Sequence, residues 1–316
     1  MKIIGTGSAL PKKVVTNQML EEFIDTSNEW IVNRTGIHQR NVISDEKLED
    51  LAAEAANSAL KDAGLEAKDI DFIVCSNVVN EYITPSLSCV LQGKIGATCA
   101  TIDVNGACAG FVYGLQLATA LLNTYSYKNI LVVSAEETTR MVNWKDRSTC
   151  VLFGDGAGAA VLTKGNNLKA IRTTTTSRPE SLKQQRELEP SPFVTKEPIV
   201  DSSLYMNGQD IFKMAVKTSI KDVRKVIDEA GVNPSDVACY VIHQANVRII
   251  DSIRQYLDQP EEKFPKNISR NGNTSSASIP ILLDELNKQG RFKEGDIIVM
   301  SAFGAGFTSG ACVIEW

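Results

Sequence analysis

Cys108 differs from the other six cysteines in the segments on either side of it. A strand-like run, residues 100–104, precedes it, and a nearly all-apolar helical run, residues 111–122, follows. A cysteine at a helix N-terminus lies close to free N–H groups and to the positive end of the helix dipole, which favour a thiolate. Cys108 could therefore act as a nucleophile. A core cysteine in a tight turn is the alternative interpretation.

His243 and Asn273 could supply hydrogen-bond donors to such a nucleophile's substrate. His243 is one of two histidines and follows a buried apolar run at 239–242, where α/β proteins place ligand-contacting groups. A histidine in a loop, with its hydrogen bonds satisfied there and no contact to a ligand, would give the same pattern. Asn273 lies among small polar residues at 271–278, which also fit a turn with a helix N-cap.

A glycine-containing segment, residues 303–307, follows another apolar run at 297–302. Glycines allow backbone N–H groups to converge on one point, as the binding of an oxyanion requires. An ordinary glycine turn is the alternative.

The sequence matches itself at a shift of 167 positions. Residues 63–74 match 230–241, and residues 130–135 match 297–302. The same shift places Cys108 on Ser275, so three matches share one shift. We therefore predict a duplicated α/β unit.

The two predicted halves are residues 1–165 and 166–316. Under the shift His243 matches Ser76 at the equivalent strand end, which places it near the interface between the halves. Within the halves, helical spacing alternates with short buried strands, so each half should have a sheet covered by helices. Residues 172–200 are polar and carry four prolines, which predicts a surface loop.

Composition excludes several classes of protein. A net charge of −5 argues against general nucleic-acid binding. No run reaches the roughly 18 apolar residues of a membrane span, and the N-terminus lacks a signal peptide, so we expect a cytoplasmic protein that does not bind membranes. Seven cysteines without a CxxC pair predict neither a disulfide framework nor a zinc or other metal site.

Together these segments resemble the β-ketoacyl-acyl-carrier-protein synthase III family of thiolase-fold condensing enzymes. The resemblance starts at Lys2, runs to the last residue and is weakest at about 166–203. The motifs that carry it are 103–111 (DVNGACAGF), 243–246 (HQAN), 272–275 (GNTS), 29–31 (EWI), 34–37 (RTGI) and 153–159 (FGDGAGA). It implies a five-layered αβαβα arrangement of two similar halves, in a homodimer.

The resemblance also implies an acyltransferase that initiates fatty acid synthesis, with Cys108, His243 and Asn273 as its catalytic triad. The Cys108 thiolate would take the acyl group from an acyl-CoA primer, with the oxyanion held by the N–H groups of Cys108 and Ala305. Malonyl-acyl carrier protein would then lose CO2 while His243 and Asn273 donate to its thioester carbonyl. The resulting enolate would attack the acyl-cysteine. No metal or redox cofactor is expected, because CO2 loss drives the reaction.

By the same resemblance, five residues would contact CoA. Trp30 would stack on the adenine, with Arg147 on its other face. Arg34 and Arg248 would contact phosphates or the pantetheine entrance, near Asn246.

Other assignments concern the carrier protein and the acyl chain. Lys213, Arg248 and Arg254 are candidates for the carrier-protein patch, with a solvated helix face as the alternative. Thr84 would line the acyl pocket of the dimer partner. Short-primer relatives have a bulky aromatic there, so we expect room for a primer longer than acetyl, or a branched one.

Three residues depart from the family pattern. Ala305 replaces the middle glycine of a triplet, and its φ must suit an alanine. Ser309 replaces a tryptophan, and Gln209 replaces an asparagine near the pantetheine channel.

Other functions remain as alternatives. A relative that primes a polyketide, or that transfers the acyl group to an alcohol or amine, would use the same residues. A biosynthetic thiolase needs a second catalytic cysteine, and Cys312 fits packing better. A chalcone-synthase-like enzyme, a papain-like hydrolase and an inactive interaction module fit the motifs less well. The sequence leaves open the primer, the acyl donor (CoA or carrier protein) and the pathway.

Overall fold

Two β-sheets organise the chain, and the computed structural model describes residues 1–187, 192–193 and 201–316. The first sheet has the strand order β1 (Lys2–Ala9), β7 (Gly156–Thr163), β6 (Asn129–Glu136), β4 (Phe72–Ser76) and β5 (Ala100–Val104). The second has the order β8 (Leu168–Thr175), β13 (Thr308–Glu315), β12 (Ile297–Gly304) and β11 (Val237–Ile242).

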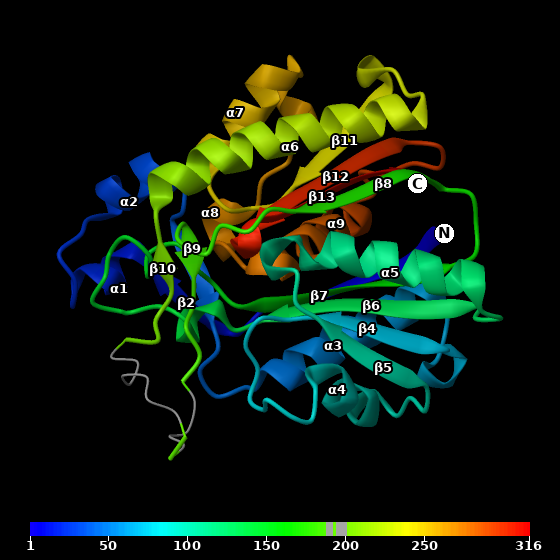
Figure 1. Cartoon of the computed structure of the whole chain (residues 1–316), viewed down its shortest axis with the longest axis horizontal. Coiled ribbons are helices and arrows are strands. Elements are labelled where there is room, and N and C mark those ends of the chain that lie inside the picture. Colours follow the sequence, from blue (N-terminus) through cyan, green and yellow to red (C-terminus); the bar gives the residue numbers. More distant parts are fainter. Residues whose placement is uncertain (188–191, 194–200) are drawn as a thin grey trace.

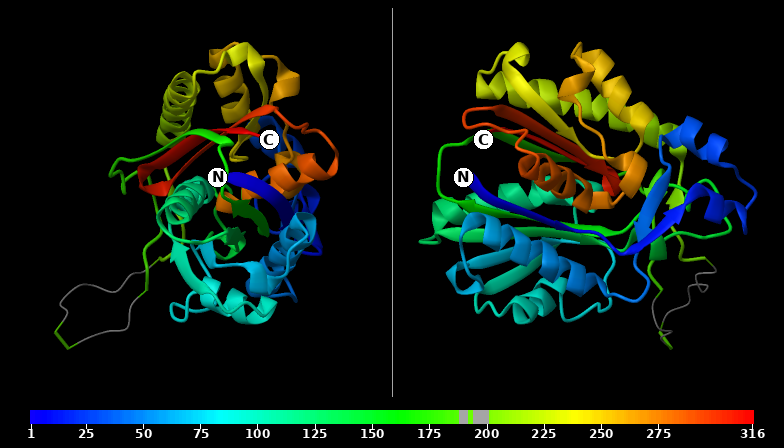
Figure 2. Two further views of the ribbon diagram at one scale, coloured as in Figure 1. Left: turned by 90° about the vertical axis from the view of Figure 1, so that its right-hand side faces the viewer. Right: turned by 180° about the vertical axis from the view of Figure 1, so that it is seen from behind.

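Helices form three layers around these sheets (Figure 1). Helices α3 (Leu48–Ala63) and α4 (Leu87–Ile95) cover the outer face of the first sheet, and α6 (Gly208–Ala230) and α7 (Val247–Leu257) cover that of the second. Between the sheets lie α5 (Gly110–Thr124) and α9 (Ser278–Lys288), as the views in Figure 2 also show. The nearly all-apolar surface of α5 suits this position, because it packs against strands of both sheets. The predicted five-layered αβαβα fold is confirmed.

The two halves repeat one pattern of strand pairing. In the first half β1 and β7 are antiparallel, as are β7 and β6, whereas β6 and β4 are parallel. The second half repeats these three relationships in β8, β13, β12 and β11. The predicted duplication is therefore present in the fold.

One residue match within the duplication was wrong by one position. The turn before each helix between the sheets has one left-handed residue, which is Ala107 (φ 48°) before α5 and Ser275 (φ 50°) before α9. Cys108 thus corresponds to Ser276 and not to Ser275. The shift grows from 167 to 168 here because helix α8 (Ile268–Asn271) and Gly272 replace the strand that precedes the turn in the first half.

The predicted surface loop at 172–200 was wrong at its beginning. Strand β8 continues to Thr175, because the polar run from Arg172 pairs with β13 in register. A short hairpin of β9 (Leu182–Lys183) and β10 (Tyr205–Met206) follows. Residues 188–191 and 194–200 lie outside the described residues.

The remaining elements lie beside the two sheets. They are β2 (Lys13–Thr16), β3 (Gln39–Val42), α1 (Asn17–Glu21) and α2 (Asn28–Thr35). No helix in the described parts of the chain is long and apolar enough to cross a membrane.

Candidate active site

Cys108, His243 and Asn273 all line one cavity of about 160 Å³, which we call the central cavity. Its walls come from both halves and are mostly apolar, with Leu152 and Phe303 among them. The turns that precede α5 and α9 meet here, so residues distant in sequence share one space.

Cys108 lies in a single 3₁₀ turn, Ala107–Ala109, between β5 and α5. The backbone enters the turn in a left-handed conformation at Ala107, whose N–H donates to Oδ1 of Asn105 at 3.1 Å. The predicted position at a helix N-terminus is therefore present. However, burial raises the pKa of the Cys108 thiol to about 12, so the expected thiolate is not the resting form.

His243 follows β11, and its backbone N–H donates to the carbonyl of Ser301 at 2.8 Å. Its ring nitrogen Nδ1 lies 2.7 Å from Oγ of Ser278, and that oxygen also accepts the N–H of Gln244 at 3.3 Å. The Ser278 hydroxyl can donate its one proton to Nδ1, and in that arrangement the histidine carries its proton on Nε2.

The His243 ring is almost completely buried and packs edge-on against Phe303, with ring centroids 5.2 Å apart. Burial lowers the pKa of His243 to about 3, because no nearby charge offsets the cost of desolvating an imidazolium. The ring is neutral at physiological pH and can act as a hydrogen-bond donor.

Asn273 is fixed by its backbone and by its side-chain oxygen. Its N–H donates to the carbonyl of Leu152 at 2.9 Å, and its carbonyl accepts the N–H of Gly154 at 3.0 Å. Its Oδ1 accepts the N–H of Ser275 at 2.9 Å. Because the oxygen is engaged, the Nδ2 group is the part of the amide left to donate to a ligand.

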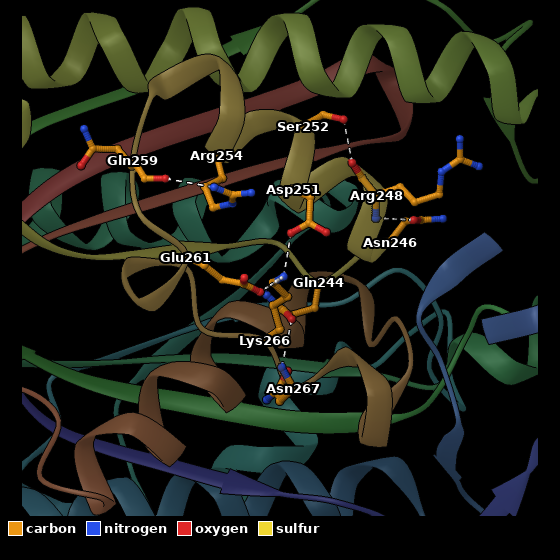
Figure 3. A network of polar contacts seen from close by, with 10 residues as sticks. All are labelled: Gln244, Asn246, Arg248, Asp251, Ser252, Arg254, Gln259, Glu261, Lys266 and Asn267. Carbon is orange, nitrogen blue, oxygen red and sulfur yellow. Dashed lines mark hydrogen bonds and ion pairs between the residues drawn. The ribbon is translucent and has the colours of Figure 1, made fainter. Parts of the chain in front are cut away.

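Gln244 connects the segments that carry His243 and Asn273 (Figure 3). Its Oε1 accepts the N–H groups of Asn267 and Ile268 at 3.1 and 3.3 Å, at the start of α8. Its Nε2 donates to the carbonyl of Ile242 at 2.7 Å. This buried amide therefore holds the end of β11 against α8.

The segment after β12 lies against the backbone of Cys108. A Cβ added to Gly304 would lie 2.5 Å from the Cys108 nitrogen, so only glycine fits there. Ala305 has no positive φ and so tolerates its side chain, while Gly306 adopts φ 134°. The residue of this segment with a positive φ is thus Gly306. Ala305 departs from the family pattern without backbone strain.

Trp30, on α2, has two guanidinium groups over its ring. Arg34 lies 4.3 Å and Arg147 5.1 Å from the ring centroid. Arg147 also donates to the backbone carbonyl of Asp25 at 2.6 Å. A base sandwiched between Trp30 and Arg147 needs about 7 Å between them, two van der Waals spacings, so Arg147 must move to admit one.

Asn246 and Arg248 lie where α7 begins, next to α2. Asn246 caps α7, because its Oδ1 accepts the N–H of Arg248 at 2.8 Å (Figure 3). Its Nδ2 donates to the carbonyl of Arg34 at 3.0 Å. Arg248 is exposed, with its guanidinium 5.9 Å from the ring centroid of Phe212 on α6. Both Phe212 and Asn246 line the central cavity.

The three candidates for a carrier-protein patch have different surroundings. Lys213 and Arg248 are exposed on α6 and α7. Arg254 is partly buried and donates to the carbonyl of Gln259 at 3.2 Å, at the other end of α7 from Arg248 (Figure 3). Thr84 is exposed in the loop after β4 and does not line the central cavity of its own chain.

Sequence reasoning missed three buried polar residues beside the triad: Ser275, Ser278 and Glu136. Ser275 lies 3.4 Å from the Cys108 sulfur through its Oγ. The two serines belong to the small polar segment 271–278, and that composition was the available signal. Glu136 ends a strand in a sequence that gives no sign of its burial.

A partly buried cysteine at a helix N-terminus, with a neutral histidine and an asparagine across the interface of a duplicated αβαβα fold, defines a thiolase-like condensing enzyme. The family model for 3-oxoacyl-[acyl-carrier-protein] synthase III matches residues 102–178, and the model for the C-terminal part of that enzyme matches residues 227–316. The chain belongs to the β-ketoacyl-[acyl-carrier-protein] synthase III family.

Individual relatives agree with this assignment over the whole chain. The β-ketoacyl-[acyl-carrier-protein] synthase III of Clostridium acetobutylicum is 40% identical, covering 100% of this chain and 98% of the relative. The crystal structure of the Aquifex aeolicus enzyme superposes with a TM-score of 0.93 at 40% identity, covering 100% and 99% of the two chains. The priming β-ketosynthase of the R1128 polyketide pathway gives 0.93 at 32% identity, covering 99% and 95%.

Proposed function

We propose that this enzyme condenses an acyl-CoA primer with malonyl-acyl carrier protein through an acyl-Cys108 intermediate, and so initiates fatty acid synthesis. The observation that carries the proposal is the convergence of Cys108, His243 and Asn273 on the central cavity. The cavity's apolar walls suit an acyl chain.

In the first stage the sulfur of Cys108 attacks the primer thioester and CoA leaves. The N–H groups of Cys108 and Ala305 hold the oxyanion. Support comes from the close approach of Gly304 to the Cys108 nitrogen, which brings the two backbone segments together.

In the second stage His243 and Asn273 donate hydrogen bonds to the malonyl thioester carbonyl as CO2 is lost. The Nε2–H tautomer fixed by Ser278 and the free Nδ2 of Asn273 are the donors. Both groups are uncharged, so they stabilise the enolate without transferring a proton at this step. We propose that no metal or redox cofactor takes part, because CO2 loss drives formation of the carbon–carbon bond.

Substrates would enter past the first turns of α6 and α7. Trp30, Arg34, Arg147, Asn246 and Arg248 lie around this entrance and would hold CoA, with Arg147 moving to admit the adenine. Lys213 and Arg248 present positive charge beside it to an acidic carrier protein. Arg254 contributes less, because its guanidinium is engaged within its own helix end.

We further propose a homodimer in the cytoplasm. Strand β5 lies at the edge of the first sheet with Ile102 44% exposed, and Ile83 in the neighbouring loop is 78% exposed. An unpaired edge and exposed apolar residues favour association with a second copy. Thr84, in the same loop, would then reach the partner's acyl pocket, where its small side chain leaves room for a longer or branched primer.

Seven free cysteines are consistent with a reducing compartment, which supports the proposed location in the cytoplasm.

The first experiment is incubation with a panel of acyl-CoAs followed by intact mass measurement, with Cys108→Ala as control. A gain of one acyl group in the wild type alone supports the nucleophile, and the best-accepted chain defines the primer. Acetyl-CoA accepted as well as or better than six- to eight-carbon CoAs would refute the long-primer proposal. No adduct from any acyl-CoA would refute the CoA-primed reaction.

The relative that primes a polyketide favours a second candidate, the same chemistry in a different pathway. Offering the acylated enzyme malonyl groups on a fatty-acid carrier protein and on a polyketide carrier protein separates the two. Preference for the polyketide carrier would favour that alternative.

A further inference from the structure

Glu136, the last residue of β6, is a completely buried carboxyl group beside the nucleophile. Its Oε2 accepts the N–H of Val78 at 3.1 Å. Its Oε1 accepts the hydroxyl of Ser275 at 3.1 Å, together with the hydroxyl and the N–H of Ser276. Four donors converge on it from the other half and from the loop after β4.

The groups that face Glu136 leave it without a counter-ion among the described residues. The thiols that it influences are Cys75, on β4, and Cys108, in the turn before α5. Just before β7, Asp155 accepts the N–H and hydroxyl of Thr139. On its own strand end, Glu137 lies 3.7 Å from Arg140. Burial raises the pKa of Glu136 to about 7, so that it can both accept and return a proton near neutral pH.

Ser275 connects this carboxyl group to the reacting sulfur. Its Oγ lies 3.4 Å from Sγ of Cys108 and 3.1 Å from Oε1 of Glu136. A hydroxyl group has one proton and cannot donate to both neighbours. When Ser275 donates to the carboxylate, its oxygen is free to accept the S–H of Cys108, which gives a continuous path for a proton.

The thiol needs a base, because burial raises its pKa to about 12. His243 is a poor base, since burial lowers its pKa to about 3. The buried carboxylate is better matched to proton transfer near neutral pH.

We propose that Ser275 and Glu136 relay the proton of Cys108 during the acyl transfer. As the sulfur attacks the thioester carbon, its proton passes to Oγ of Ser275, and the Ser275 proton passes to Oε1 of Glu136. The S–C bond to Cys108 forms, and the bond to CoA breaks with its electron pair on the CoA sulfur. The CoA thiolate leaves and takes a proton from solvent.

The condensation step returns the relay to its starting state. The enolate carbon attacks the acyl group, and the Cys108 sulfur leaves with the electron pair of the thioester bond. The proton stored on Glu136 then passes back through Ser275 to this sulfur. Condensation therefore needs no proton from solvent in the central cavity.

The inference rests on the proposed role of Cys108, and its test uses a reagent that needs no acyl substrate. Iodoacetamide alkylation of Cys108 is followed against pH, and peptide mass spectrometry separates it from the exposed Cys89. In the wild type the rate should rise to a plateau as Glu136 ionises. In Ser275→Ala the plateau should be lost, with a rate about 100-fold lower near neutral pH that rises tenfold per pH unit.

Glu136→Gln should behave like Ser275→Ala, and the double variant should be no slower than either, because the two residues act as one unit. Glu136→Gln could fail to fold, since its amide nitrogen would face the N–H of Val78. Ser275→Ala carries no such conflict and decides the test alone. If the alkylation rate of Ser275→Ala shows the same plateau and inflection against pH as the wild type, the relay is overturned.

Ser276→Ala is the matched control. It removes a hydrogen bond that lowers the pKa of Glu136, while the path through Ser275 remains. The inflection should therefore move to higher pH with the plateau retained. Loss of the plateau in this variant would instead indicate general damage to the site and would overturn the assignment. Absence of acylation by any acyl-CoA would count against the proposed function alone.

Discussion

Oγ of Ser278, the first residue of α9, lies 2.7 Å from Nδ1 of His243, within reach to donate to that nitrogen and so favour a ring proton on Nε2. Ser278→Ala removes this bond and allows the wrong tautomer. We expect condensation to slow about tenfold, while acylation by acyl-CoA is unchanged. Separate acylation and condensation assays check this, with Ser278→Thr as the hydroxyl-retaining control. Equal losses in both steps would contradict the assignment.

His243 should remain neutral over the whole physiological range. Burial lowers its pKa to about 3, so the ring gains a proton only in strong acid. The chain has two histidines, which makes ring NMR signals simple to assign with a His243→Gln variant. We expect the His243 signals to stay constant from about pH 8 to about pH 5. Titration within that range would contradict the neutral-donor role.

The backbone around Gly304 should tolerate no side chain. Gly304→Ala places a Cβ 2.5 Å from the Cys108 nitrogen, and displacement of that N–H should slow acylation about 100-fold. Ala305→Gly is the matched control, because it changes the next residue by one methyl group, at a position without positive φ, and keeps the backbone N–H. Single-turnover acylation measures both. Near-normal acylation in Gly304→Ala would argue against an oxyanion site here.

Trp30 should contribute to CoA affinity through its ring. Trp30→Ala should raise the KM for acyl-CoA about tenfold or more, since stacking of one base on an aromatic ring contributes about 1–3 kcal/mol. Trp30→Phe keeps a ring and should have a smaller effect. The KM for malonyl-acyl carrier protein serves as the internal reference. An unchanged KM for acyl-CoA would place the adenine elsewhere.

Lys213 should act on the carrier protein and not on CoA. Lys213→Glu replaces an exposed positive charge and should raise the KM for malonyl-acyl carrier protein several-fold, more at low salt than at high salt. Lys68→Glu makes the same charge change on an exposed residue of the other half. If both variants behave alike, only net charge matters and the patch lies elsewhere.

The residues whose chemistry was conspicuous in the sequence are those that the fold brings together. Cys108 precedes a helix and His243 follows a buried strand, and the resemblance to the family, together with the duplication, implied that they meet Asn273. Glu136 escaped notice because a glutamate at a strand end is ordinarily exposed. Only the packing of the second half over β6 buries it.

Local replacements explain the other differences. The match of Cys108 to Ser275 failed by one residue because α8 takes the place of a strand in the second half. The threonines of β8 looked like loop residues because composition does not reveal that they complete the edge of a sheet. Contact between Arg147 and Trp30 depends on side-chain conformation, which sequence does not specify.

The halves are joined by a single exposed connection, residues 164–167 between β7 and β8. Non-covalent contacts hold the halves together as well: the packing of α5 and α9 between the two sheets, and hydrogen bonds such as that from the N–H of Asn273 to the carbonyl of Leu152. The active site therefore lies between the two halves of one polypeptide, in the way that other sites lie between two subunits. A cut in this connection would leave two fragments with complementary apolar faces. Each fragment would hold part of the proposed catalytic triad, with Cys108 in the first and His243 and Asn273 in the second.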